Sequence, residues 1–432
     1  MARLVSIAVL ICTSGGCGGG ERCEGSFWTS NAKDLEEIQD CAEITGLLDI
    51  QGQGLTKVEL PNLESVGMAF SLNIPDTLRE TDFPRLKTIG GDLNIYSCNA
   101  LENLDGLRDV KTVGGGLRVV ESHKLVDLSG LSNLESLGGA LEITANNGLT
   151  SLHGLENIDS LAGINIRENT QLINLDAIGS IAVLGSSTAA LLTIESNTNL
   201  ESVIFTELRE IEGILLFRGN PALVNVEFEK VEAADDFGFD DNDALVSVTL
   251  PSLTSLSRDV GISRNAALST VQLPGVTSMR GVFVMENPSL ANLEMSNLAS
   301  VKVVNISNNE SLATTGLTAL SAVVGCVEIL DNDGMTQLGL PSLTSVGAWL
   351  NVSGNNVLDD LGLVSLVSVG ENVEIRDNPV LPVCNVEALV AQLEAFTGNV
   401  DNSRNDHPCD PDPCPGGFCS MDCSAAEDYV CD

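Results

Sequence analysis

The stretch GISRNAALSTVQLP at residues 261–274 decides the fold, because nearly the same pattern returns along most of the chain. Closely similar segments are LEITANNGLTSL at 141–152, INIRENTQLINL at 164–175 and VEIRDNPVLPV at 373–383. Each begins with apolar residues in alternate positions, which is typical of a short strand with one buried face. An asparagine follows, and then a further apolar residue. One polar residue therefore keeps a fixed place in an apolar frame.

The spacing of this asparagine is nearly constant, with successive steps of 23, 28, 23, 22, 23, 22, 22, 23, 23 and 23 residues. Its positions are Asn146, Asn169, Asn197, Asn220, Asn242, Asn265, Asn287, Asn309, Asn332, Asn355 and Asn378. The step of 28 contains an insert, GSSTAAL, at 185–191. Upstream, the equivalent places hold Gln53, Thr77, Cys98 and Ser122. A steady period predicts a solenoid whose coils cannot bury a core alone but do so by stacking.

The chain is therefore predicted to be an all-β parallel solenoid of about fifteen coils of 22–23 residues. The inward asparagine forms a ladder, because its amide can bond the turn of its own coil and of its neighbours. Replacing Asn265 with leucine should cost about 1–3 kcal/mol for the groups left unsatisfied. We interpret Cys98 as a substitute in the same ladder.

Both open ends of a parallel solenoid need a cover, and the sequence offers two short helices. The segment NAKDLEEIQDCAEI at 31–44 contains helix-forming residues, and NVEALVAQLEAFTG at 385–398 is amphipathic and closed by Gly398. Twelve cysteines crowd at the chain ends, which favours disulfides in an oxidising compartment. The predicted pairs are Cys23 with Cys41 and Cys384 with Cys409. The remaining tail cysteines have no resolvable connectivity.

The N-terminus, MARLVSIAVLICTSGGCGGG, has one basic residue, an apolar run at 4–11 and then small residues before Cys17. It resembles a bacterial lipoprotein signal in which Cys17 is acylated. The expected organisation is a signal peptide at 1–16, a glycine-rich tether at 17–22, a solenoid at 23–408 and a cysteine-rich tail at 409–432. Ordinary cleavage and an uncleaved anchor are the alternatives.

The amino-acid composition limits which residues can fill the core and which partners the protein can bind. Apolar residues make up 43% of the 432 residues but aromatic residues only 3%, so Leu, Ile and Val must fill the core. The formal net charge is −39. Nucleic-acid binding needs a surface rich in Lys and Arg, so this charge argues against a nucleic-acid partner and against a basic patch on anionic lipid.

The segment DLEEIQDCAEITGLLDIQG at 34–52, followed by GGDLNI, GGGLRV and GGALEI, resembles the receptor L-domain family. The most specific residues of the resemblance are Cys41, Ile44, Gly46, Leu48 and Ile50. The resemblance covers about residues 23–405 and implies a leucine-rich-repeat-like right-handed β-helix that presents a β-face to protein or glycan ligands. The chain departs from the receptors in having about fifteen uninterrupted coils, so a growth-factor-receptor role is not implied.

The outward strand positions vary in chemistry from coil to coil, unlike the inward ones. The candidates for a binding face are Phe283, Met285 and Leu330, together with the basic residues Arg167 and Arg218. An exposed aromatic and methionine pair on a sheet indicates an interface. A locally tolerated apolar patch, or contact with a flanking loop, is the alternative.

Catalytic and metal sites have little support in the sequence. The acidic stretch DDFGFDDND at 235–243 places Phe237 and Phe239 inward and gives a weak calcium candidate in Asp236, Asp240 and Asp241. A solvated acidic turn is the simpler interpretation. The three histidines, His123, His153 and His407, lie far apart and form no triad with a nucleophile. No cofactor is expected.

These patterns favour a non-catalytic protein of the bacterial envelope, lipid-anchored at the outer membrane and exposed at the cell surface, that binds a protein or glycan ligand. Secreted and periplasmic locations remain alternatives. Two other functions stay open. A structural spacer or scaffold predicts that no single substitution on the face matters. A glycan-active β-helix enzyme predicts paired carboxylates along a groove, for which Asp236 and Asp240 are the only pair.

Overall fold

The computed structural model describes residues 20–185 and 190–405. It confirms the predicted fold class: the chain is a parallel β-solenoid of about 16 turns, with two α-helices in its described part. The chain divides into two compact units, residues 1–213 and 214–432. We describe each by itself. Strand β20 (Glu210–Arg218) contains the boundary.

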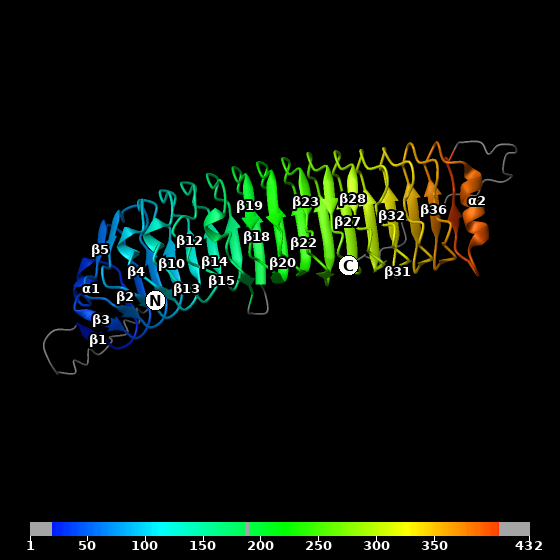
Figure 1. Cartoon of the computed structure of the whole chain (residues 1–432). Helices are drawn as coiled ribbons and strands as arrows, with labels where there is room; N and C mark the ends of the chain where they lie inside the picture. Colours follow the sequence, from blue (N-terminus) through cyan, green and yellow to red (C-terminus); the bar gives the residue numbers. More distant parts are fainter. Residues whose placement is uncertain (1–19, 186–189, 406–432) are drawn as a thin grey trace, which may run out of the picture. The chain divides into compact units, whose positions relative to one another are not determined.

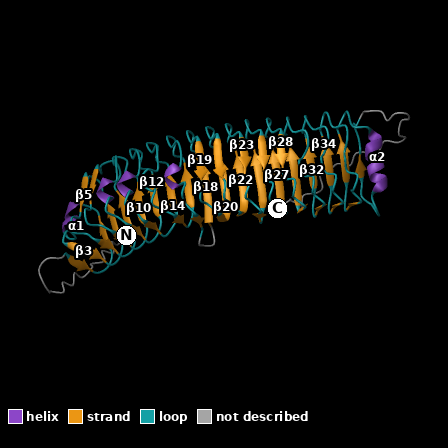
Figure 2. Ribbon diagram, in the orientation of Figure 1, coloured by secondary structure: helices purple, strands orange, loops and turns teal. Residues whose placement is uncertain are grey.

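The first unit winds its coils so that corresponding strands of successive coils pair in parallel (Figures 1 and 2). The main face consists of β2 (Phe27–Thr29), β4 (Leu48–Gln51), β7 (Phe70–Asn73), β10 (Leu93–Tyr96), β12 (Leu117–Val120), β14 (Leu141–Thr144), β16 (Ile164–Arg167) and β18 (Ala190–Glu195). A second face consists of β1 (Glu21–Cys23), β3 (Cys41–Ile44), β6 (Ser65–Val66), β9 (Thr88–Ile89), β11 (Thr112–Val113), β13 (Ser136–Leu137), β15 (Ser160–Leu161) and β17 (Val183–Leu184). The remaining elements are β5 (Lys57–Glu59), β8 (Glu80–Asp82), β19 (Ser202–Phe205) and the 3-10 turns η1 (Asp105–Leu107), η2 (Ser129–Leu131) and η3 (Asp176–Ile178).

The second unit repeats this plan with longer main strands. Its main face consists of β22 (Ala233–Asp240), β25 (Asp259–Ser263), β27 (Gly281–Met285), β30 (Val303–Ser307), β32 (Val327–Leu330), β34 (Leu350–Ser353), β36 (Val373–Arg376) and β37 (Val400–Asp401). The second face consists of β24 (Ser255–Leu256), β29 (Ser300–Val301), β31 (Ala322–Val323), β33 (Ser345–Val346) and β35 (Ser368–Val369). The third group consists of β21 (Asn225–Phe228), β23 (Ser247–Thr249), β26 (Thr270–Gln272) and β28 (Asn292–Glu294).

Alternation along each main strand builds the core. Val260 and Ile262 of β25 are fully buried, and they pair in register with Val282 and Val284 of β27. The sequence prediction that Phe237 and Phe239 point inward is confirmed, since their side chains are 0% and 1% exposed. Phe239 stacks on Phe217 with ring centroids 4.9 Å apart. Leu, Ile and Val form most of the rest of the core, which also includes Phe70, Phe83, Phe205 and Phe228.

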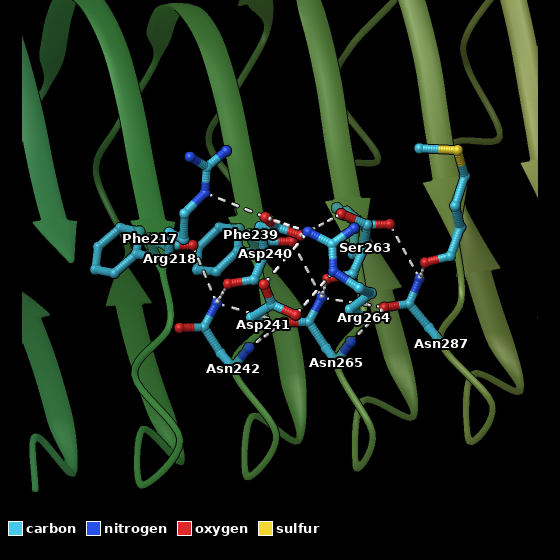
Figure 3. A network of polar contacts seen from close by, with 12 residues as sticks. Phe217, Arg218, Phe239, Asp240, Asp241, Asn242, Ser263, Arg264, Asn265 and Asn287 are labelled. Atoms are coloured by element: carbon cyan, nitrogen blue, oxygen red, sulfur yellow. Dashed lines mark hydrogen bonds and ion pairs between the residues drawn. The ribbon is translucent and has the colours of Figure 1, made fainter. Parts of the chain in front are cut away.

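The recurring asparagines are completely buried and joined in a continuous hydrogen-bonded chain within each unit (Figure 3). Asn265 shows the pattern. Its Nδ2 donates to the backbone carbonyls of Phe239 at 3.1 Å and of Ser263 at 2.9 Å. Its Oδ1 accepts from the backbone N–H of Asn242 at 3.1 Å. Each amide thus satisfies the turn of its own coil and of the preceding one.

The ladder differs from the sequence pattern at its ends. Ser122 and Cys98 continue it in the first unit, where the backbone N–H of Cys98 donates to Ser122 Oγ at 3.3 Å. Burial raises the pKa of the Cys98 thiol to about 11. Gln53 is exposed, and Thr77 Oγ1 is buried without a hydrogen-bond partner, so neither extends the ladder. At the other end Asn405 accepts from the backbone N–H of Asn378, which adds a rung that the sequence pattern missed.

A left-handed residue precedes each rung and turns the asparagine inward. Arg264 has φ 54°, Asp241 55° and Glu286 57°, and Gly354 occupies the same place before Asn355. Residues other than glycine rarely adopt a positive φ. The hydrogen bonds of the asparagine that follows hold the backbone in this conformation. The turn after the strand is therefore as regular as the strand itself.

The N-terminal cap contains the predicted disulfide between Cys23 and Cys41. The expected helix over 31–44 is wrong in its extent: α1 spans only Ala32–Glu36, and Cys41 begins β3. The side chain of Asn31 caps α1 by accepting hydrogen bonds from the backbone N–H groups of Lys33 and Asp34. The helix ends early because Ile38 must turn into the core, where it is 1% exposed. The solenoid also begins earlier than expected, since Glu21 and Arg22 belong to β1 rather than to a tether.

The C-terminal cap also differs from its prediction. Helix α2 spans Val383–Gln392, so it starts before residue 385 and ends six residues short of Gly398. Leu393 stops it in an extended conformation. Gly398 instead passes against the carbonyl of Glu371, where a Cβ has no room. Cys384 is disulfide-bonded, but its predicted partner Cys409 lies outside the described residues, as do Cys17 and His407.

Neither helix of the described ranges has the length and apolar character that crossing a membrane requires.

Candidate binding face

The outward positions of the main face in the second unit form rows that run across the strands in strict register. The first row carries Gly238, Gly261, Phe283, Asn305, Glu328, Asn351, Glu374 and Asp401. The second row carries Asp240, Ser263, Met285, Ser307, Leu330, Ser353 and Arg376. These side chains change from apolar to acidic to basic over a few strands, whereas the inward rows stay aliphatic.

The structure brings the predicted apolar candidates together. Phe283, Met285 and Leu330 are each half-buried on the outward face. Met285 and Leu330 share one row, with Ser307 between them. Ser307 is only 7% exposed and its hydroxyl donates to Asn305 at 3.0 Å, so the residues between the apolar side chains are tied down. Apolar contact area and fixed polar groups are thus adjacent on one rigid surface.

The ring of Phe283 lies close to Gly281, two residues earlier on the same strand. A Cβ at Gly281 would collide with the edge of that ring, and Gly281 itself is buried. The glycine therefore makes the space in which the aromatic ring rests. A half-buried ring packed in this way loses little side-chain freedom when a ligand binds.

The predicted basic residues Arg167 and Arg218 lie next to carboxylates of other coils. In the second unit, Arg218 Nε lies 3.1 Å from the carboxylate of Asp240 (Figure 3). Asp240 also receives Arg264 at 2.6 Å and the hydroxyl of Ser263 at 2.5 Å. Its side chain is almost completely buried by these partners, with the residue 8% exposed. Arg264 in turn pairs with Asp241 at 2.8 Å.

Arginines of the first unit are paired with carboxylates in the same way. Arg167 Nε lies 3.6 Å from Glu195, and Arg118 lies between Asp92, at 2.5 Å, and Glu142, at 3.2 Å. Burial acts to raise the pKa of Asp92, but the N–H of Gly116 and the guanidinium of Arg118 outweigh it and hold that pKa below its usual value. Arginines on the face therefore join carboxylates of neighbouring coils.

The weak calcium candidate is not supported by the geometry. Asp236 and Asp240 lie four residues apart on β22, about 13 Å along an extended strand. Asp240 and Asp241 already bind arginines, whereas burial raises the pKa of Asp236. Within the described ranges no three His, Cys, Asp or Glu side chains are grouped so that they could hold a metal ion. Most of the stretch is strand β22, and arginines pair with Asp240 and Asp241, while Asp243 is exposed.

His123 and His153 lie in the described ranges, and both are exposed. His153 Nδ1 lies 2.6 Å from Glu156 Oε1, three residues away.

A shallow groove of about 540 Å³ follows the turns of the last coils. It is lined by Asn308, Glu310, Asp331, Asp333, Gly354, Asn356, Asp377, Pro379 and Arg404. Arg404 and Arg376 pair with Asp377 there.

Sequence reasoning missed the importance of Gly238 and Gly261. They are register partners on β22 and β25, and both point outward. The signal was available, because a strand of this period seldom carries glycine at the same outward place in two successive coils. The repeat alone already places Leu216 before these glycines and Phe283 after them in the same outward row, and the structure agrees.

Comparisons with known proteins identify no family for this chain. No protein-family model matches the chain, and no curated protein matches it. Among solved structures, the chain is similar to the TLR13 chain in the crystal structure of a TLR13–ssRNA13 complex. The two are 15% identical with a TM-score of 0.29, and the match covers 88% of this chain. The chain spans 64% of the TLR13 chain. That likeness carries no argument about ligands.

Proposed function

We propose that this protein is a non-catalytic recognition protein that binds a protein or glycan ligand on the outward main face of its solenoid, as the resemblance to receptor L domains implies. The observation that supports the proposal is the contrast between rows. The inward rows keep one chemistry, which packing demands, while the outward rows vary and include half-exposed Phe283 and Met285. An apolar pair on an otherwise acidic sheet is typical of a contact site.

The paired charges support shallow and specific contact rather than general electrostatic attraction. Arg264 pairs with Asp240 and Asp241, and Arg280 pairs with Asp259, so these charged groups of the face are held by partners before a ligand arrives. Binding then loses little side-chain entropy, and a rigid face can gain affinity from modest area. Steering by net charge would instead require unpaired charges on the face.

Phe283→Asp is expected to abolish saturable binding of the purified full chain to isolated cell envelopes while leaving its unfolding midpoint nearly unchanged. A new carboxylate at the centre of the apolar contact must be desolvated without a partner. The measurement is a binding isotherm of the fluorescently labelled protein. The matched control is Val324→Asp, which makes the same change at a residue that is 72% exposed and lies off the main face.

Loss of binding in Phe283→Asp alone supports a recognition face. Equal binding by the wild type and both variants contradicts the face assignment. If the wild type shows no saturable binding, the structural spacer replaces recognition, because a spacer has no localised hot spot.

We further propose that the protein is exported, anchored at the outer membrane through a lipid on Cys17 and exposed at the cell surface. Protease treatment of intact cells is expected to release peptides from residues 23–405, identified by mass spectrometry. A periplasmic protein of known location is the control for envelope integrity. Protection of those peptides until the cells are lysed would contradict surface exposure and favour a periplasmic scaffold.

A further inference from the structure

Two neighbouring outward positions of the candidate face carry glycine, so no side chain covers the sheet there. Gly238 and Gly261 are register partners in adjacent strands, and neither has a positive φ. A Cβ at Gly261 would meet nothing closer than the carbonyl oxygen of Phe237 at 4.0 Å. A Cβ at Gly238 would meet only the tip of the Leu216 side chain, at 3.0 Å. Neither backbone conformation nor crowding therefore requires glycine at Gly261, and at Gly238 only a flexible side chain would have to move.

Strand glycines without such a requirement weaken the fold. Glycine inside a strand is less stable than alanine because it loses more backbone entropy on folding, and it offers no side chain to pack. Its usual meaning is a place where a ligand or another backbone approaches closely. Because the two glycines are neighbours, they expose a strip of backbone two strands wide, about 10 Å across.

Apolar side chains flank this strip at both ends of the row. Leu216, on β20, contacts the space above Gly238, and Phe283 is the register partner of Gly261. Both flanking residues are half-buried. The strip with its two flanks, Leu216, Gly238, Gly261 and Phe283, is called the glycine floor below.

Polar groups border the glycine floor along both long edges. On one edge, Arg280 forms an ion pair with Asp259, whose side chain is 15% exposed. On the other edge, Asp240 binds Ser263, Arg264 and Arg218 (Figure 3). Each edge thus offers fixed hydrogen-bond donors and acceptors, and the opposite charges compensate one another. In a protein of net charge −39 this compensation favours a ligand that is polar but uncharged.

We propose that the glycine floor binds a ring of a neutral oligosaccharide; this deepens the proposed function and rests on it. A sugar ring has an apolar C–H face, which fits the bare backbone and the exposed face of Phe283, and peripheral hydroxyls, which fit the paired carboxylates and guanidinium groups at the edges. A peptide strand fits less well. The backbone groups of β25 already pair with β22 and β27, so none is free for strand addition.

The test is binding of the purified full chain to an array of neutral, uronic-acid-containing and sulfated oligosaccharides, followed by calorimetry with the best neutral probe. We expect wild-type binding to neutral oligosaccharides and a loss of at least ~10-fold in affinity in Gly261→Leu. That variant fills the floor where the structure has room, so its unfolding midpoint should stay equal or rise. The matched control is Asn351→Leu, which places leucine in the same row on β34 and should bind normally.

Three results would overturn the inference: no binding to any neutral oligosaccharide, binding restricted to acidic ones, or wild-type affinity in Gly261→Leu. The envelope assay with Phe283→Asp separates this failure from failure of the proposed function. If Phe283→Asp still abolishes envelope binding, recognition stands and its ligand is not a neutral glycan. If it does not, the recognition face itself is rejected.

Discussion

Asn265→Leu is expected to lower the free energy of unfolding by about 3–5 kcal/mol, because the substitution removes every hydrogen bond that the Asn265 side chain makes in the ladder. The buried N–H of Asn242 loses its only acceptor, Asn265 Oδ1, at a cost of about 1–3 kcal/mol. The carbonyls of Phe239 and Ser263 each lose one donor, at about 1 kcal/mol apiece. This exceeds the 1–3 kcal/mol predicted from the sequence, because the sequence does not show how many backbone groups one asparagine satisfies.

The measurement combines denaturant midpoints with amide hydrogen exchange, because a solenoid can open coil by coil. Exchange of the Asn242 amide should accelerate most, since its acceptor is gone. Asn351→Leu is the matched control, for it replaces a half-buried outward asparagine whose Oδ1 accepts one side-chain hydrogen bond, from Ser353. A similar loss of stability in both variants would mean that the ladder contributes no more than surface asparagines do.

The solenoid could be predicted from sequence because its signals are local and repeated. Alternation of apolar residues over four positions and an asparagine every 22–23 residues determine the strand, the turn and the stacking. The final rung escaped prediction because Asn405 follows Asn378 by 27 residues, with α2 and β37 between them. A period search fails where an element of another kind interrupts the period.

The cap helices were mispredicted in length because composition does not show which way a side chain must face. Residues 31–44 contain good helix formers, yet Ile38 and Cys41 are each nearly fully buried. A five-residue helix followed by a strand allows both to reach the core, and a continuous helix does not. Tertiary burial therefore overrides helix propensity at this end.

The candidate face was predictable only in part. Outward positions follow from alternation, so Phe283 and Met285 could be placed on one face. The neutralisation of Arg218 could not, because its partner Asp240 lies 22 residues away and on another coil. The meaning of Gly261 also depends on register, since its neighbours in space are Gly238 and Phe283 rather than residues near it in sequence.

Gly114→Ala is expected to destabilise the first unit by about 2–3 kcal/mol, although it adds one methyl group to a corner. A Cβ at Gly114 would fall on the carbonyl oxygen of Gly90, and the N–H of Gly114 bonds Ile89 at 2.8 Å, so the coil cannot move away. Gly138 stands in the same relation to Gly114, so the clash is built into the stack. Overpacking of this kind costs about 1–3 kcal/mol. The repeated GG pairs of the sequence therefore mark the closest approach of successive coils.

The control is Gly261→Ala, which makes the same chemical change on a strand where the nearest atom is 4.0 Å away. Its unfolding midpoint should be unchanged or higher, because alanine loses less backbone entropy on folding than glycine does. Denaturant midpoints and hydrogen exchange in the coils around residues 90–138 distinguish the two variants. Equal midpoints would show that the corner can relax by a few tenths of an ångström. In that case the GG pairs would reflect turn conformation rather than close packing. A lower midpoint in Gly114→Ala alone would instead establish that the two glycines differ in their role. Gly114 is required by close contact between coils at the corner, whereas Gly261 lies where a side chain would have room.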